Sequence, residues 1–275
     1  GKAVTLTNGK YTFKVTANCT FEAEFAKIGG SSGGTGGSGG SSGGSSGGSS
    51  TRSLPSINGI EKSWQSIVSD ISRLPEGGSS VIALNGETVV PVEVVRAIAD
   101  VKAKVEFVVS TAKSWMIDGA KITTVCAADF TALPGNADKT SLRGVNGAAF
   151  KGGDTGVPAV LKLTFRKEFA GQFANVYKLA DNRLVFLRCV KITADGTALI
   201  SGLNTAGEYA VMVCEYSDLP GDINNDGVLN ALDASAVLKH AAGISAGADL
   251  LFADFNNDGT VNALDASAIL KAIIE

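Results

Sequence analysis

The feature that most constrains this chain is an internal repeat near its C-terminal end. The string DINNDGVLNALDASAVLKHAA begins at Asp222, and DFNNDGTVNALDASAILKAII begins 32 residues later at Asp254. Fourteen of the 21 aligned positions are identical. A duplication of this kind predicts two copies of one small structural unit placed side by side.

Each copy carries oxygen-bearing residues at the spacing of an EF-hand calcium loop, which uses loop positions 1, 3, 5, 7, 9 and 12. Calcium takes six to eight hard oxygen ligands, and this spacing wraps them around one point. Gly227 and Gly259 stand at position 6, where the loop turns sharply. Position 12 is Asp in place of the usual Glu, so each loop must close more tightly. The candidate ligands are Asp222, Asn224, Asp226, the carbonyl of Val228, Asn230 and Asp233 in the first copy, and Asp254, Asn256, Asp258, the carbonyl of Thr260, Asn262 and Asp265 in the second.

The charge distribution agrees with two bound calcium ions. Residues 221–275 hold eight acidic side chains against Lys239 and Lys271, whereas the whole chain has a net charge of −3. Acidic residues concentrated at regular spacing favour a hard cation. The negative balance also argues against a nucleic-acid partner.

The segments around the loops define the type of module. Helix-forming residues follow each loop, over 234–242 and 266–274, whereas Leu219-Pro220-Gly221 breaks the chain before the first loop. Two loop–helix copies without an entering helix, filling residues 221–275, resemble a dockerin. The resemblance implies a secreted or cell-surface protein of the cellulosomal kind. It also implies a calcium-dependent function, in which the dockerin binds a cohesin module of a scaffoldin and so attaches the parent protein to an extracellular scaffold.

In dockerins, loop positions 10 and 11 and polar residues of the following helix contact the cohesin. The resemblance therefore implies the partner-binding residues Ala231, Leu232, Ser235 and Lys239 in the first copy, and Ala263, Leu264, Ser267 and Lys271 in the second. The Ala-Leu pairs depart from the Ser-Thr pair of the best-known clostridial type, which leaves the cohesin class open and indicates a more hydrophobic contact. In the alternative reading, Leu232 and Leu264 are core residues of the helix packing.

Residues 57–218 are the largest block and read as mostly β. An apolar helix face is predicted over 64–71, and Pro91 suits the first turn of a second helix. Strand patterns cover 81–84, 105–109, 115–117, 160–165, 176–179, 184–190 and 209–213. The segment NGETVVPVEVVRAIADVKAKVEFVV resembles the X modules that precede dockerins in clostridial and ruminococcal proteins. Because only residues 216–220 separate the last predicted strand from Asp222, and Pro220 stiffens them, we expect the block to pack on the dockerin and support it.

The N-terminal part reads differently. Residues 1–28 show alternating strand patterns and weakly resemble an internalin B repeat, so we expect the remnant of an upstream β module. A linker over 29–56 follows, of which residues 29–50 are only Gly, Ser and Thr. Without a starting Met or a leader, the chain is expected to be a fragment or the mature end of a secreted product. Its four cysteines allow three full pairings or buried free thiols.

Residues 57–218 leave two other functions open. A small hydrolase is disfavoured because the only histidine, His240, lies in the repeat region, so no Ser-His-Asp or Cys-His arrangement is available in the block. Carboxylate-pair chemistry stays open, but the acidic residues of the block are scattered among strands and turns, as on a solvated surface. Carbohydrate binding would need exposed aromatic side chains, for which Trp64 and Trp115 are the candidates. No stretch approaches the ~20 apolar residues of a membrane span. The sequence thus predicts a non-enzymatic, multi-domain chain: a mostly β (α+β) X-like module, then an all-α calcium-binding dockerin over 219–275 with two EF-hand-like loop–helix repeats.

Overall fold

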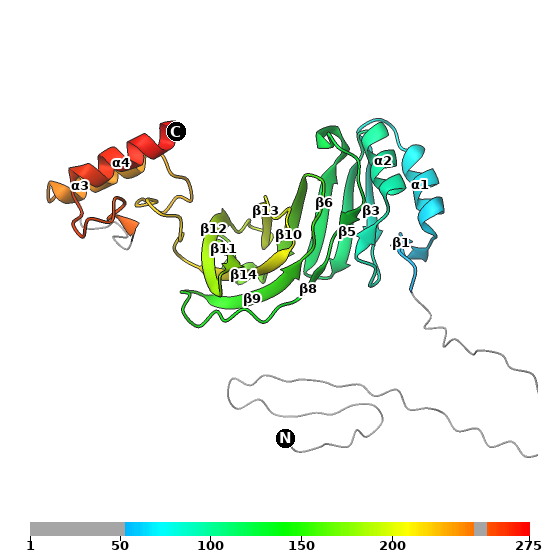
Figure 1. The fold of residues 1–275 in the computed structure, drawn as a ribbon, viewed down its shortest axis with the longest axis horizontal. Coiled ribbons are helices and arrows are strands. Elements are labelled where there is room, and N and C mark those ends of the chain that lie inside the picture. Colours follow the sequence, from blue (N-terminus) through cyan, green and yellow to red (C-terminus); the bar gives the residue numbers. More distant parts are fainter. Residues whose placement is uncertain (1–52, 245–251) are drawn as a thin grey trace, which may run out of the picture. The chain divides into compact units, whose positions relative to one another are not determined.

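The computed structural model describes residues 53–244 and 252–275 (Figure 1). The strands expected within 1–28 and the uniform Gly/Ser/Thr segment lie outside the described residues, as does Cys19. The linker expected to extend to residue 56 ends earlier, because β1 (Ser56–Ile57) already pairs with β2 (Ile60–Glu61) and β3 (Ser79–Ala83).

The two helices predicted in the β-rich block are present. Helix α1 (Trp64–Ser72) begins after Ser63, whose side chain accepts a hydrogen bond from the Ser66 amide, and it buries Ile67 and Ile71. Helix α2 (Val92–Asp100) buries the predicted face at Val94, Val95, Ala97 and Ile98. Pro91 precedes the first helical residue and does not lie within the first turn.

A seven-stranded sheet carries these helices, and its strand order is β13-β10-β6-β5-β3-β1-β2. Strands β3 and β5 pair in parallel, with α2 between them in the chain, and the other neighbours are antiparallel. Figure 1 shows α1 and α2 next to each other beside this sheet. The remaining strands of the sheet are β5 (Lys104–Ser110), β6 (Lys113–Asp118), β10 (Ala159–Thr164) and β13 (Thr197–Ser201).

A second, antiparallel sheet follows the order β12-β11-β14-β9-β8. Its strands are β8 (Ala132–Pro134), β9 (Val145–Gly152), β11 (Phe173–Ala180), β12 (Arg183–Lys191) and β14 (Gly207–Cys214). Strands β4 (Val89–Val90) and β7 (Ala128–Asp129) form a small separate pair, and short 3-10 turns cover Gly119–Lys121 and Lys167–Phe169. The last strand, β14, leads directly into the C-terminal region.

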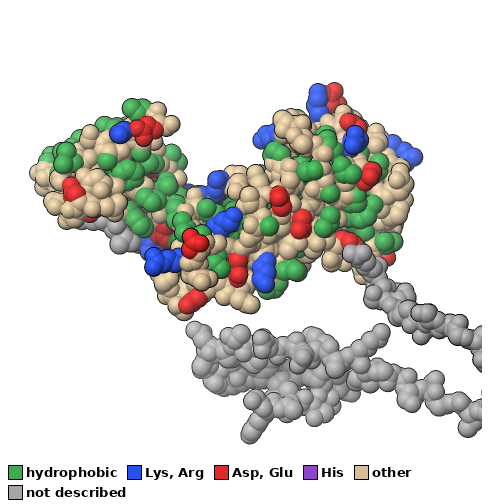
Figure 2. Space-filling view, in the orientation of Figure 1, with side chains coloured by type: hydrophobic (Ala, Val, Ile, Leu, Met, Phe, Trp, Pro, Cys, Tyr) green, Lys and Arg blue, Asp and Glu red, His purple; other side chains and the backbone are tan. Residues whose placement is uncertain are grey.

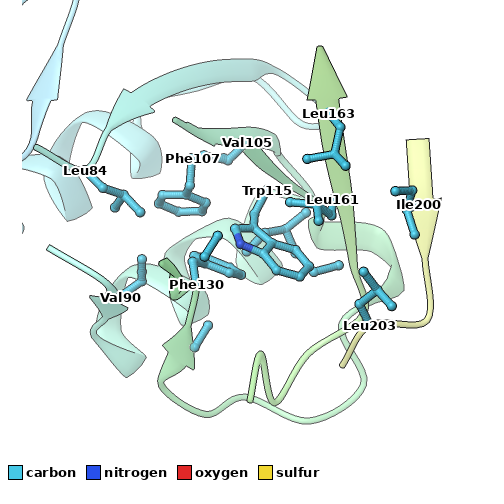
Figure 3. Packing of buried hydrophobic residues seen from close by; sticks show 14 of the residues in the cluster. Leu84, Val90, Val105, Phe107, Trp115, Phe130, Leu161, Leu163, Ile200 and Leu203 are labelled. Atoms are coloured by element: carbon cyan, nitrogen blue, oxygen red, sulfur yellow. The ribbon is translucent and has the colours of Figure 1, made fainter. Parts of the chain in front are cut away.

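One large hydrophobic core joins the helices and both sheets (Figure 3). Trp115 lies at its centre, fully buried, with its ring 5.9 Å from the Phe130 ring; Phe107 packs 5.0 Å from Phe130 on the other side. Trp64 is half-buried against the same core. An exposed Trp115 was one basis for a carbohydrate-binding interpretation, and its burial removes that basis.

The fold class expected for residues 219–275 is wrong. Most of the described regular structure belongs to the β-sheet domain, and the described part of the C-terminal region contains two α-helices, α3 (Ala231–Ala241) and α4 (Ala263–Ile274). The region is therefore not a clear all-α fold of two EF-hands. The physical reason is local. Outside α3 and α4, side-chain oxygens of the loop Asp residues accept backbone N–H groups, so these segments form turns and not further helices.

Two further features concern the whole described part. None of the helices within 53–244 and 252–275 has the length and apolar character needed to span a membrane. Cys126, Cys189 and Cys214 are free thiols, so no bridge joins these three residues.

Candidate functional site

The first loop is organised around the carboxylate of Asp222. One of its oxygens accepts the Asp226 amide at 3.0 Å and the other accepts the Gly227 amide at 2.9 Å. Asn224 Oδ1 also accepts the Asp226 amide at 3.0 Å. Gly227 has a φ of +89°, a left-handed conformation that glycine adopts without steric cost. The loop therefore bends back on its first carboxylate, as the spacing predicts.

Asp233 closes the first loop from its far end. Its side chain is fully buried and accepts amide protons from Ile223 at 2.9 Å, Asn224 at 3.2 Å and Asn230 at 2.8 Å. The bond from Asn230, the N-cap of α3, belongs to a capping box. This cap explains why the helix begins at residue 231 and not at 234, where the sequence alone suggested.

The second loop repeats this arrangement. Asp254 accepts the amides of Asp258 at 3.0 Å and Gly259 at 2.9 Å. Asp265 is fully buried and accepts the amides of Asn256 at 3.1 Å and Asn262 at 2.8 Å, again within a capping box. Matching hydrogen bonds in both copies show that the sequence identity produces one local structure twice.

The pKa values of two loop carboxylates, Asp222 and Asp265, shift in opposite directions. Burial raises the pKa of Asp222, against the opposing effect of hydrogen bonds from Ser217, Gly227 and Asp226. Burial also acts to raise the pKa of Asp265, but the backbone N–H groups that it accepts lower this pKa overall. Burying a carboxylate costs free energy because it loses its hydration, and a cation bound beside it would offset that cost.

The donor set of each loop fits calcium. The predicted ligands are carboxylate, amide and main-chain oxygens, and the loop hydrogen bonds draw several of them together. For example, Asn224 Nδ2 lies 3.0 Å from Asp226 Oδ2, and Asn230 Nδ2 lies 3.2 Å from the Val228 carbonyl. The equivalent distances in the second loop are 3.0 Å, from Asn256 to Asp258, and 3.2 Å, from Asn262 to Thr260.

Within the described ranges, no group of three or more His, Cys, Asp or Glu side chains gathers at metal-binding spacing. A calcium site here depends on the Asn amides and the main-chain carbonyl as well as on carboxylates.

The predicted partner-binding residues of each repeat share one helix face. Leu232 is 64% exposed and Leu264 is 62% exposed, so the alternative that they belong to the core is wrong. At 3.6 residues per turn, Leu232, Ser235 and Lys239 lie on the same side of α3, opposite the buried Val237. Figure 2 shows hydrophobic side chains gathered on the part of the surface formed by these helices.

The same helix face contains two residues that the sequence analysis missed. Leu238 is 46% exposed and Leu270 is 45% exposed, at equivalent positions of α3 and α4. Each stands three residues after a predicted contact serine, which places it on the same face. The i, i+3 spacing from each serine is the sequence signal that could have identified these two leucines. We call the two surfaces the repeat faces: Ala231, Leu232, Ser235, Leu238 and Lys239 on α3, and Ala263, Leu264, Ser267, Leu270 and Lys271 on α4.

A small core lies beneath the repeat faces. Buried Ile223, Val237, Ala253 and Ile269 pack together with Ala234 and Ala266, and α3 contacts α4. His240 is half-buried in the last turn of α3. The apolar side chains inside this core and those on the repeat faces therefore belong to different helix surfaces.

Residues 220–274 match the family model of the dockerin type I domain. No curated protein and no solved structure matches the chain. The match supports a dockerin in the C-terminal region, and residues 53–219 lie outside it. In general, type I dockerins are non-catalytic modules that bind calcium and cohesin and occur in extracellular cellulosome components.

Proposed function

We propose that residues 219–275 anchor this protein to an extracellular scaffold by binding a cohesin module through the repeat faces of the dockerin. The observation that carries this proposal is the duplicated site: each dockerin loop is followed by a helix whose exposed side presents Leu, Ser, Leu and Lys at equivalent positions. Apolar residues beside a single cation suit an apolar partner surface with an acidic rim.

Cohesin binding is tested by titrating the chain into purified cohesin modules with calcium and with excess chelator. We expect binding with calcium only. A cohesin panel that shows no calcium-dependent binding would contradict the proposal. A pull-down with this chain from the surface proteins of the parent organism then identifies which cohesin the chain binds.

We further propose that each loop holds one calcium ion, through the twelve predicted ligands. Without a cation, the charge of Asp233 acts on the carboxylate of Asp222 in the first loop, and this repulsion opposes the loop conformation. The capping boxes connect the loops to α3 and α4, so opening a loop removes a helix start.

Calcium removal is therefore expected to unfold the helices of residues 219–275. Circular dichroism of this segment should lose most of its helical signal on addition of chelator and recover it when calcium is restored. Residues 53–218, which contain no proposed calcium loop, serve as the control and should keep their spectrum. Unchanged helicity and melting temperature of 219–275 would contradict the two-ion proposal.

The role we propose for the β-sheet domain is that of a support for the dockerin, as the resemblance to X modules implies. Residues 50–275 cluster as one compact unit, and only a short segment separates β14 from Asp222. Asn175 of β11 is fully buried, and its side chain bonds the Tyr216 carbonyl at 3.0 Å and the Asp218 amide at 2.9 Å. A fixed connecting segment restricts how far the dockerin moves.

This support predicts a difference between the longer and the shorter chain. We expect the dockerin helices to melt at a higher temperature in residues 53–275 than in residues 219–275. We also expect the longer chain to bind cohesin more tightly, because it loses less conformational entropy on binding. Calorimetry of both chains at one calcium concentration measures both effects. Identical melting and affinity would argue against support.

A further inference from the structure

The two dockerin loops share a backbone but differ in what their fourth residue contacts. Asn225 and Asn257 both have a φ of +57°. The Ser217 amide donates to Asn225 Oδ1 at 2.7 Å, and Asn225 Nδ2 donates to the Glu215 carbonyl at 3.0 Å. The side chain of Asn257 is exposed to solvent. The first loop is thus tied to residues 215–217, outside the repeat.

Residues 215–218 are themselves fixed to the β-sheet domain. Besides the two bonds from Asn175, Arg143 donates to the Ser217 carbonyl at 2.8 Å and to the Asp218 carboxylate. Tyr177, which is 4% exposed, donates its hydroxyl proton to the same carboxylate. The segment that contacts Asn225 is therefore hydrogen-bonded to the β-sheet domain at several points.

The first loop also lies directly against the domain. A Cβ added at Gly227 would stand 2.8 Å from a ring carbon of Phe173. At Gly259, no atom of the described part of the chain lies within 4 Å of the equivalent point. Asp222 is 2% exposed, whereas Asp254 is half-buried. The first loop is consequently restrained from two sides, by the connecting segment and by β11.

We infer that the two calcium loops are inequivalent, and that the contacts of the β-sheet domain make the first loop hold its ion longer. This inference rests on the proposed function, since it presumes that both loops bind calcium. A loop already held in its closed form loses less conformational entropy when it binds. Releasing the ion from the first loop requires breaking contacts to residues 215–217 and Phe173, and the second loop makes no equivalent contact with the residues that the structure describes.

The test measures calcium release from the full 275-residue chain. The calcium-loaded protein is mixed rapidly with a fluorescent calcium chelator, and two release phases of equal amplitude are expected. Asp258→Ala removes a ligand of the second loop, so the fast phase should disappear and only the slow phase should remain. Asp226→Ala, the matching change in the first loop, should leave only the fast phase.

The decisive pair is Asn225→Gly and Asn257→Gly. Glycine accepts a φ of +57° without strain, so each variant removes the side chain alone. Losing two hydrogen bonds should accelerate the slow phase about tenfold in Asn225→Gly. Asn257→Gly should leave both rates unchanged. Asn225→Asp keeps the acceptor for the Ser217 amide and loses the donor, so an intermediate rate is expected.

Equal effects of the two glycine variants would overturn the inference, as would two bound ions released in a single phase. Equilibrium dialysis separates this result from failure of the proposed function. If the chain binds no calcium, the proposed function and the inference both fall. If two ions are bound but leave together, the inference alone is overturned.

Discussion

Leu232→Asp combined with Leu264→Asp is expected to abolish cohesin binding, whereas each single substitution should leave the affinity nearly unchanged. The two repeat faces present identical residue types, so a receptor patch that accepts one is expected to accept the other after the dockerin turns by half a revolution. One intact face is then sufficient. With both changed, an unpaired carboxylate is buried in either orientation, at a cost of several kcal/mol. Titration calorimetry with a cohesin in excess calcium measures the three variants.

The matched control is Leu133→Asp combined with Val185→Asp. These apolar side chains are 55% and 50% exposed, but they lie on β8 and β12, outside the repeat faces. The control should bind cohesin as the unchanged chain does. If Leu232→Asp alone removes binding while Leu264→Asp has no effect, one face is used and the two-orientation proposal is wrong.

Asp218→Ala is expected to destabilise the β-sheet domain by about 3 kcal/mol, because it removes a buried carboxylate that both pairs with Arg143 and accepts a hydrogen bond from Tyr177. Asp218 is 7% exposed and contacts both Arg143 and Tyr177. Burial, reinforced by the Asp218 charge, raises the pKa of Tyr177, so this hydroxyl stays protonated and donates its hydrogen bond at neutral pH. For a domain of this size, the melting temperature should fall by roughly 6–12 °C.

Glu76→Ala is the corresponding control, since Glu76 forms an exposed ion pair with Lys102 at 2.5 Å. Exposed pairs contribute little, so this variant should melt nearly as the unchanged chain does. Asp218→Asn retains the shape and one acceptor oxygen and should fall between the two. Equal melting of Asp218→Ala and Glu76→Ala would show that the buried contacts of Asp218 do not stabilise the domain.

The sequence by itself determined the features that depend on near neighbours along the chain. The loop spacing, the glycines at position 6 and the four helices could be predicted because turns, caps and helix faces are set within a few residues. Strands rich in apolar residues, such as β5 and β14, were predicted for the same reason. Strand β9 was missed because its sequence, VNGAAFKG, has little β-branched or alternating character.

Only the tertiary structure decided which residues are buried and which distant segments meet. Val81 lies in a predicted strand, and the structure leaves it 52% exposed because one face of β3 lies outside the core. Trp115 and Leu232 are both apolar residues beside polar neighbours, yet one is fully buried and the other is exposed. Asn225 and Asn257 are identical in local sequence, and they differ because Asn225 alone meets residues 215–217 held by β11. Burial and long-range pairing depend on chain segments far apart in sequence, so local patterns cannot specify them.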